Sequence, residues 1–302
     1  MKILVIHNTS SGYGDGSIYD FVRLVLADGD EACIRTTDGT TPVRVLVQDA
    51  TDFDTVVASG GDGTVAAVAH HLAYSGVPIL PFPAGTANLL ANNLMSPMEP
   101  HALAKLVREG TVLDFDLGEI EAGGKKFGFG VMAGAGYDAT IMNAAKPSKR
   151  LLGSMAYFQA AFMNVLPQKS HISIDVDGEH HEFDGLGILL VNFSKIQFDI
   201  TVTHENEPRD GFFQVVILKA QNAFGLIPVL IAGILDRDGE FPSRSDSIEV
   251  LRGREIYCEC NPPMNIQFDG EVPGFETPFH AHVLDGAAKF IVSEEGFTLF
   301  RD

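Results

Sequence analysis

The run Ser59-Gly60-Gly61-Asp62-Gly63-Thr64 has the residue types of a loop that binds phosphate. Its glycines permit backbone conformations that other residues resist, so successive N–H groups can converge on an anion. The helix-permissive stretch that begins near Thr64 would add the positive end of its dipole. Asp62 lies among these donors, and its carboxylate would repel phosphate unless a cation separates them, so we expect Mg²⁺ on a bound nucleotide. The alternative is a tight strand-to-helix turn in which Asp62 caps the helix.

A second loop, Pro83-Ala84-Gly85-Thr86-Ala87-Asn88, has the same place in a strand–loop–helix unit. We expect its strand over residues 77–82 and its helix to reach Asn93. In a parallel sheet both loops would lie at the carboxyl ends of their strands, where α/β proteins bind ligands. The pair of loops therefore favours phosphate binding over an isolated turn.

The elements that must position these loops alternate between strand and helix in the first third of the chain. One helix is predicted over residues 17–27, where apolar side chains recur with a helical period. Continuous apolar runs typical of buried parallel strands occupy residues 3–6, 32–35, 55–58 and 77–82. This alternation predicts a doubly wound α/β domain.

Beyond about residue 112 the pattern changes to short β-like runs separated by turn residues, with helices predicted only over residues 151–165 and 224–235. We therefore expect an α/β chain whose N-terminal doubly wound α/β domain is followed by a second, β-rich sandwich-like domain, with a nucleotide cleft between them. The predicted domains are residues 1–115, to which a C-terminal segment of about 285–302 returns, and residues 116–284. Strands are predicted at residues 113–117, 126–131, 171–176, 187–191, 212–218, 247–251, 255–260, 265–268, 280–283 and 289–292.

Composition narrows the class of partner. The formal charge is −19 over 302 residues, which repels nucleic acid and anionic bilayers over about 8 Å at physiological salt. The apolar run at the N-terminus is too short for a signal peptide, and the longest apolar stretch, residues 223–235, is too short to cross a bilayer. We therefore expect a cytoplasmic protein that does not bind nucleic acid. The alternating pair His280 and His282 lies on a β-like segment and could share one face, with a metal role there as the less favoured alternative.

Together, residues 60–64 and 85–88 resemble the diacylglycerol kinase catalytic domain, a family that includes bacterial lipid kinases and eukaryotic sphingosine and ceramide kinases. The wider superfamily holds NAD kinases and phosphofructokinases. Further segments match the lipid kinase branch in the same order. They are residues 8–12, Thr36, Phe115-Asp116-Leu117-Gly118, Pro208-Arg209-Asp210-Gly211-Phe212-Phe213 and Gln267-Phe268-Asp269-Gly270-Glu271.

The resemblance implies a role for each matched residue. Glu271 would be the catalytic base, with Asp269 the other candidate, and Asp62 would join them in catalysis. A structural Mg²⁺ would be held by the side chain of Asp210 and by backbone carbonyls of Glu207 and Phe212, and Asp116 would help to bind metal. For Asp210-Gly211 and for Asp269-Gly270, the alternative is an ordinary hairpin turn. ATP would be bound by Asn8, Ser10, Ser11, Gly12, Thr36, Gly60, Gly61, Asp62, Gly63, Thr64, Gly85, Thr86 and Asn88.

The resemblance therefore implies an ATP- and Mg²⁺-dependent kinase that phosphorylates the free hydroxyl of a lipid, with transient membrane contact and a homodimer as further expectations. Two other functions stay open. A soluble-substrate kinase of the NAD kinase type would share the first loop. A non-catalytic nucleotide or lipid sensor is suggested by Ala66, Ala67 and Leu89, which stand where the family often has polar residues.

Overall fold

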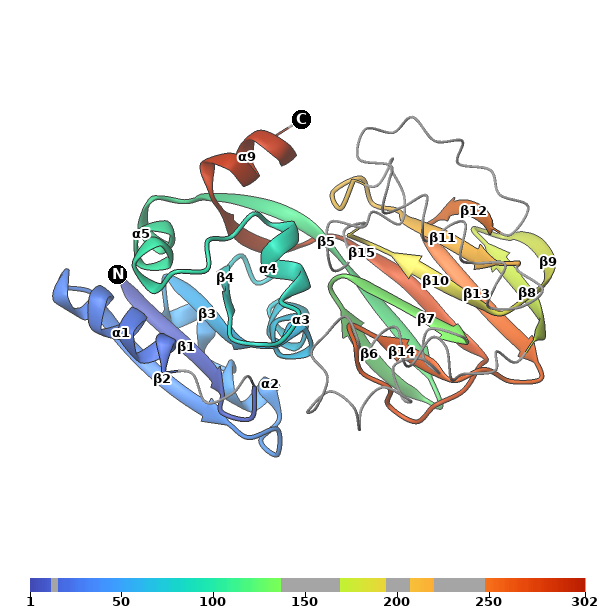
Figure 1. Cartoon of the computed structure of the whole chain (residues 1–302), viewed down its shortest axis with the longest axis horizontal. Coiled ribbons are helices and arrows are strands. Elements are labelled where there is room, and N and C mark those ends of the chain that lie inside the picture. The colour runs from blue at the N-terminus through green and yellow to red at the C-terminus, as the bar shows by residue number, and fades with distance from the viewer. Residues whose placement is uncertain (12–15, 137–168, 194–206, 220–247, 302) are drawn as a thin grey trace.

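The computed structural model describes residues 1–11, 16–136, 169–193, 207–219 and 248–301. An N-terminal part of mixed helices and strands lies beside a part built of strands (Figure 1). The helices are α1 (Ser17–Ala27), α2 (Val43–Leu46), α3 (Asp62–His71), α4 (Leu89–Asn93), α5 (Pro100–Glu109), α9 (Glu294–Phe300) and a 3₁₀ turn (Ala50–Asp52). The strands are β1 (Lys2–Asn8), β2 (Glu31–Thr37), β3 (Thr55–Gly60), β4 (Pro78–Pro83), β5 (Thr111–Ala122), β6 (Lys125–Phe129), β7 (Met132–Gly136), β8 (Ser170–Val176), β9 (Glu179–Gly185), β10 (Gly187–Val191), β11 (Phe213–Leu218), β12 (Ile248–Gly253), β13 (Glu255–Asn261), β14 (Ile266–Phe268) and β15 (Phe279–Val292).

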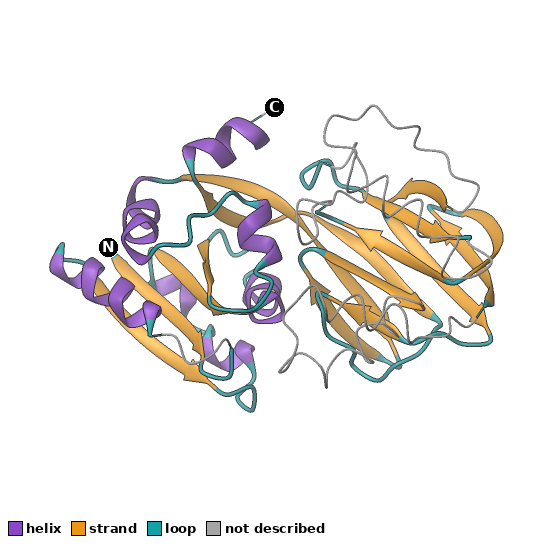
Figure 2. Ribbon diagram, viewed as in Figure 1, coloured by secondary structure: helices purple, strands orange, loops and turns teal. Residues whose placement is uncertain are grey.

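The N-terminal part is a parallel sheet with strands in the order β2-β1-β3-β4. Helices cover both of its faces (Figure 2). Successive side chains of β1 point to opposite faces, so Ile3 and Val5 pack with α1 and α5, whereas Leu4 and Ile6 pack with α2 and α3. Because both faces are buried, these strands consist of continuous apolar runs.

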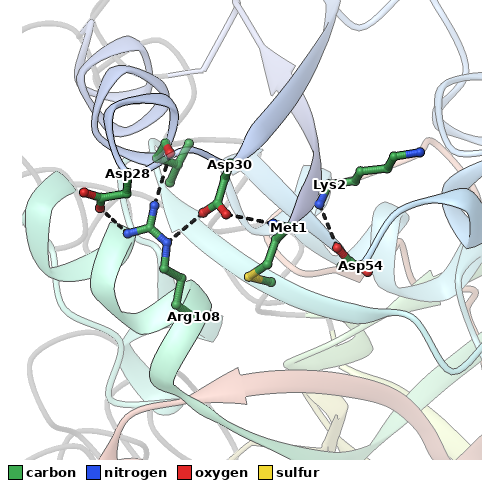
Figure 3. Close-up of polar contacts among 7 residues, drawn as sticks. Met1, Lys2, Asp28, Asp30, Asp54 and Arg108 are labelled. Atoms are coloured by element: carbon green, nitrogen blue, oxygen red, sulfur yellow. Dashed lines mark hydrogen bonds and ion pairs between the residues drawn. The ribbon is translucent and has the colours of Figure 1, made fainter.

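Arg108 of α5 ties the first helix to the start of the chain (Figure 3). Its guanidinium pairs with Asp28 and, at 2.7 Å, with Asp30, and it donates to the carbonyl of Val25 at the end of α1. Asp30 also accepts from the amino group of Met1 at 2.7 Å. Since α1 and α5 share one face of the sheet, this cluster fixes how that layer sits on β1.

The long strands β5 and β15 run through both parts of the chain. Near its end β15 pairs in parallel with β4, at Lys289 and Phe290. Near its start it pairs antiparallel with β13, and it pairs along most of its length with β5. One continuous sheet therefore extends from β2 to β9. The predicted domain boundaries, between residues 115 and 116 and between residues 284 and 285, fall within β5 and β15. Because these two strands contribute to both parts, the boundaries stay a prediction.

The second sheet, ordered β12-β11-β10-β7-β14, packs face to face on β5, β6, β13 and β8. Apolar side chains from both sheets fill the space between them, among them Ile174, Leu190, Phe213 and Ile256. The predicted α/β domain followed by a β sandwich is confirmed.

Some elements differ from the sequence prediction. The strands predicted at residues 280–283 and 289–292 are one strand, β15, and β7, β9 and α5 were not predicted. The helices predicted over residues 151–165 and 224–235 lie outside the described residues. Within the described ranges, no helix is long and apolar enough to cross a membrane.

Candidate active site

The first glycine loop follows β3, which is buried along its whole length. Gly61 precedes α3 with φ −78° and ψ 177°, so its backbone is extended. None of Gly60, Gly61, Gly63 and Gly85 has a positive φ. The expectation that these glycines supply unusual backbone angles is therefore wrong. Gly60, Gly63 and Gly85 are needed for space instead, whereas Gly61 has room for a Cβ. A Cβ on Gly85 would lie 2.5 Å from Cα of Gly61, because the two loops touch.

The loop after β1 braces the first glycine loop. The side-chain amide of Asn8 donates to the Thr64 hydroxyl at 3.0 Å, and Gly61 N donates to the Ser11 hydroxyl at 3.2 Å. The hydroxyl of Ser10 instead donates to the carbonyl of Asp38 at 3.0 Å. The structure therefore brings Asn8, Ser11 and the first glycine loop together.

The second loop is closed by Asn88. This residue has φ 51°, its Oδ1 accepts from Gly85 N at 2.7 Å, and its Nδ2 donates to Gly85 O at 3.1 Å. Its side chain thus shapes the loop. Thr86, between these two residues, is exposed. Of the predicted contacts from this loop, Thr86 is therefore the side chain free to meet a ligand.

Asp62 links the two loops. It is the first residue of α3, but its Oδ1 accepts from Leu90 N at 2.9 Å, so it caps the start of α4 and not its own helix. Burial raises the pKa of Asp62, although backbone N–H groups at residues 88–90 oppose the shift. The alternative that Asp62 caps α3 is wrong, because the carboxylate crosses to the neighbouring loop.

A two-residue turn presents Asp269 and Glu271 in opposite directions. Phe268 and Glu271 exchange backbone hydrogen bonds of 3.0 and 2.8 Å, and the two residues between them have φ values of 42° and 86°. Two positive φ values define the type I′ hairpin turn that Asp-Gly favours. The hairpin alternative is thus confirmed for Asp269-Gly270, and it is this turn that aims the two carboxylates.

The Asp269 carboxylate is buried and accepts three consecutive backbone N–H groups, those of Gly130 (2.6 Å), Val131 (2.8 Å) and Met132 (3.0 Å). The pKa of Asp269 is raised to about 7, mainly by burial and in part by the nearby charge of Asp62, against the effect of these three bonds. Asp269 therefore holds the β6–β7 turn in place beside Asp62.

Glu271, in contrast, is exposed. A Cβ on Gly63 would lie 3.0 Å from Cδ of Glu271 and would overlap its carboxylate oxygen. The Glu271 carboxylate thus lies against the first turn of α3. An exposed acid from the sandwich half is therefore in contact with the glycine loop of the N-terminal half.

Asn192 connects the β6–β7 turn to Asp116. Its Nδ2 donates to the carbonyls of Asp116 and Gly130, both at 2.8 Å. The buried Asp116 carboxylate accepts from Gly211 N and Gly286 N, each at 2.7 Å, and burial raises its pKa. The Asn192 amide thus joins the backbone of Asp116 to Gly130, whose N–H in turn binds the Asp269 carboxylate.

The residues expected to hold a structural Mg²⁺ do not fit one as they lie. Asp210 Oδ1 accepts from Phe212 N at 2.9 Å, and its Oδ2 pairs with the Arg252 guanidinium at 2.7 Å. That guanidinium lies 4.0 Å from the Phe212 ring centroid, and the Arg254 guanidinium lies 4.5 Å from it. The carbonyl of Glu207 accepts from Asp210 N at 3.2 Å. Two positive groups beside Asp210 would repel a divalent ion.

Two other residues were predicted to bind ATP, Thr36 and Gly12. Within the described ranges, no side-chain hydrogen bond joins Thr36 to the glycine loops. Thr36 is exposed near the end of β2, opposite His7 in the register, and Gly12 lies outside the described residues. Three residues of this region were missed: Asn192, Arg252 and His7, whose Nδ1 lies 3.0 Å from the Ser59 hydroxyl. A polar residue ending the apolar run 187–191 was the available signal for Asn192. His7 and Arg252 had none, because strand pairing brings their partners to them.

Comparison with known proteins agrees with this geometry. Residues 2–120 match the model of the diacylglycerol kinase catalytic domain, and residues 131–292 match that of the YegS C-terminal NAD kinase beta sandwich-like domain. A Pseudomonas aeruginosa protein named "Probable lipid kinase YegS-like" is 34% identical over 76% of this chain and 76% of its own length. A Bacillus subtilis diacylglycerol kinase is 25% identical over 74% of this chain and 73% of its own.

Two further similarities bear on length and fold. An uncharacterised Synechocystis protein is 26% identical over 72% of this chain, which spans only half of that relative. The crystal structure of a diacylglycerol kinase from Bacillus anthracis superposes with a TM-score of 0.76 at 22% identity, covering 97% of this chain and 98% of the other. An α/β domain followed by a β sandwich is thus a shared architecture. The chain belongs to the diacylglycerol kinase family, in the branch with a YegS-type C-terminal domain.

Proposed function

We propose that the protein transfers the γ-phosphate of ATP to the free hydroxyl of a lipid, diacylglycerol or a related molecule, in the cytoplasm. The observation that carries this proposal is the contact between the exposed Glu271 carboxylate and Gly63 in the first turn of α3. If Glu271 accepts the proton, it would do so next to a helix N-terminus that can hold phosphate. Family membership and the relatives named as diacylglycerol kinases support the same reaction.

In this proposal the ATP phosphates lie over the start of α3, in a cleft between the two halves. Backbone N–H groups of residues 61–64 and the exposed hydroxyl of Thr86 would contact them. Asn8, Ser11 and Asn88 would act one step away, since their hydrogen bonds shape the two loops. Ser10, Gly12, Thr36 and Gly60 stay predicted nucleotide neighbours.

A Mg²⁺ ion on the nucleotide fits the acids beside this loop. The half-buried Asp62 and the buried Asp269 are neighbouring carboxylates, and desolvation raises the pKa of each. A hard cation favours such a set of oxygens and would relieve their repulsion. We propose that Asp62, which belongs to the loop itself, holds the ion. When bound, Mg²⁺ would neutralise charge that develops on the transferred phosphoryl group.

Glu271 would accept the proton of the lipid hydroxyl as that oxygen bonds to the γ-phosphorus. The bond from the γ-phosphorus to the bridging oxygen breaks, and ADP leaves with the electron pair. Asp269 would act as a positioning residue, because its three N–H bonds tie the hairpin turn that presents Glu271 to the β6–β7 turn. Asp116 would support the same turn through Asn192.

Ala66 weakens the case for a non-catalytic sensor. This residue is 2% exposed, and a Cβ on Gly130 would lie 3.8 Å from it, beside Asp269. A polar side chain would have to be buried there, so the alanine suits the packing of α3 against the β6–β7 turn. Membrane contact and a homodimer stay predictions.

The test is a phosphorylation assay with radiolabelled ATP and four acceptors offered in parallel: diacylglycerol, phosphatidylglycerol, sphingosine and NAD. Label is expected in a lipid product and to depend on Mg²⁺. Label in NAD alone would replace the lipid kinase by a kinase of the NAD type. If ATP binds but no acceptor is labelled, the sensor alternative replaces the proposed transfer.

A further inference from the structure

Two histidines stand side by side on the outer face of the sandwich. In β15, Phe279 and Ala281 are buried, whereas His280 and His282 point the other way, because side chains alternate along a strand. Their ring centroids are 5.9 Å apart. The sequence alone leaves a metal role for this pair as the less favoured alternative, and the structure confirms only that the two side chains share a face.

Strand pairing supplies a third potential ligand, a carboxylate. Glu255 of β13 lies directly opposite His282 in the antiparallel register. Its Oε2 lies 2.7 Å from Nε2 of His280. One potential ligand atom from each of these three residues lies within 4.8 Å of the others. Two imidazoles and a carboxylate therefore converge from two neighbouring, rigid strands.

A fourth residue is placed to orient this group. Glu119 of β5 faces His282 from the other side of β15, and its Oε1 lies 3.7 Å from Nε2 of His282. The same carboxylate binds Lys126 at 2.6 Å and His70 at 2.9 Å. Acidic partners of this kind set the orientation of ligand imidazoles in metal sites.

We propose that Glu255, His280 and His282 form a site for a divalent transition metal of the Zn²⁺ class. Imidazole nitrogen favours such ions over Mg²⁺, which prefers oxygen ligands. Zinc binds nitrogen at about 2.0–2.1 Å, so small side-chain rotations would close the three ligand atoms around one ion, with water completing a tetrahedron. Glu255 and His280 are exposed and His282 is half-buried, so an ion has access to the site from solvent.

The site lies apart from the candidate active site. His70, which Glu119 binds, is near the C-terminal end of α3, whereas Asp62 begins that helix. Ten residues of α-helix span about 15 Å. The proposed metal is thus independent of the nucleotide and of the kinase reaction, and its test needs no substrate.

The test is calorimetric titration of the metal-free full chain with ZnCl₂, supported by the visible spectrum of bound Co²⁺. We expect one ion to bind in the micromolar range, and His280→Gln together with His282→Gln to weaken binding by about tenfold or more. His180→Gln is the matched control, since His180 pairs with Asp175 at 2.7 Å on the same face and is 53% exposed, against 48% for His280. It should leave the affinity unchanged.

Circular dichroism would show that each variant is folded. Undiminished zinc affinity in the folded double variant, or equal loss in the His180 variant, would overturn the proposal. So would the absence of any binding to the wild-type chain. Excess Mg²⁺ should not displace the zinc, and displacement would mean that the site is of another class.

Discussion

Replacing Gly85 by alanine should separate the two glycine loops. The new Cβ would lie 2.5 Å from Cα and 3.2 Å from N of Gly61, and 3.0 Å from Oδ1 of Asn88. Carbon atoms in favourable contact are about 3.5–4.0 Å apart, so one loop must move by about 1 Å. Neither loop is free to do so, because Asp62 and Asn88 hold them by hydrogen bonds. Overpacking of this kind costs about 1–3 kcal/mol.

Gly61→Ala is the matched control at the same contact. Its Cβ would lie 3.9 Å from Cα of Gly85, an ordinary separation, and its φ is negative. The lower entropy of the unfolded chain and the weaker N-cap oppose each other, so stability should stay within about 1 kcal/mol of wild type.

Urea unfolding followed by circular dichroism would measure both variants. The midpoint should fall clearly for Gly85→Ala and little for Gly61→Ala. Equal stability of Gly85→Ala and wild type would mean that the loops do not touch as described. An equal loss in both variants would mean that space between the loops is not what selects glycine.

Three further outcomes are expected. Gly63→Ala should leave the free energy of unfolding within about 1 kcal/mol of wild type, because the new Cβ would overlap only the movable end of the Glu271 side chain. Phosphate transfer should fall, because that carboxylate is displaced. Unchanged turnover would contradict the contact between Gly63 and Glu271. Arg252→Ala should lower the free energy of unfolding by about 1 kcal/mol, since the ion pair with Asp210 is half exposed. Because Asp210 is released, Mg²⁺ should then raise the melting temperature of the variant but not of wild type. An equal effect of Mg²⁺ on both proteins would show that a cation already binds at Asp210. The raised pKa of Asp269 stabilises the fold at low pH, and this stability is lost as pH rises through about 7. The free energy of unfolding of the wild type should therefore fall by a few kcal/mol as pH rises, and Asp269→Asn should remove most of that fall, the rest coming from Asp62 and Asp116. The same pH profile in both proteins would assign the step elsewhere.

Much of the N-terminal part could be predicted because its signals are local. The strand before Gly60 and the helix over residues 17–27 follow from apolar periodicity, and both agree with the structure. Two missed strands lack that signal for physical reasons. β9 is a largely polar strand at the edge of its sheet, and β7 contains Gly134, where a Cβ would overlap the carbonyl of Ile188 on the neighbouring strand. The close approach of these two strands leaves room only for glycine at position 134, although glycine has a low strand propensity.

The motifs of the candidate site could be predicted from the sequence, but the directions and partners of its side chains could not. Sequence left Asp269 and Glu271 as alternative bases, and the turn between them separates the two by pointing one inward and one outward. Asp62 caps a helix 28 positions along the chain, and Asp210 pairs with Arg252 at a separation of 42. Such partners come from tertiary pairing, which no local pattern of residues encodes.

The most direct test of the proposed reaction compares single-turnover phosphate transfer from ATP to diacylglycerol by the wild type, Glu271→Gln and Glu276→Gln. Glu276 is an exposed acid five positions further on and is the matched control. Removing a general base should slow transfer by about 10²–10⁴-fold in the Glu271 variant, with ATP binding retained and the Glu276 variant unaffected. Transfer by Glu271→Gln at the rate of Glu276→Gln would contradict the role of Glu271 as the base.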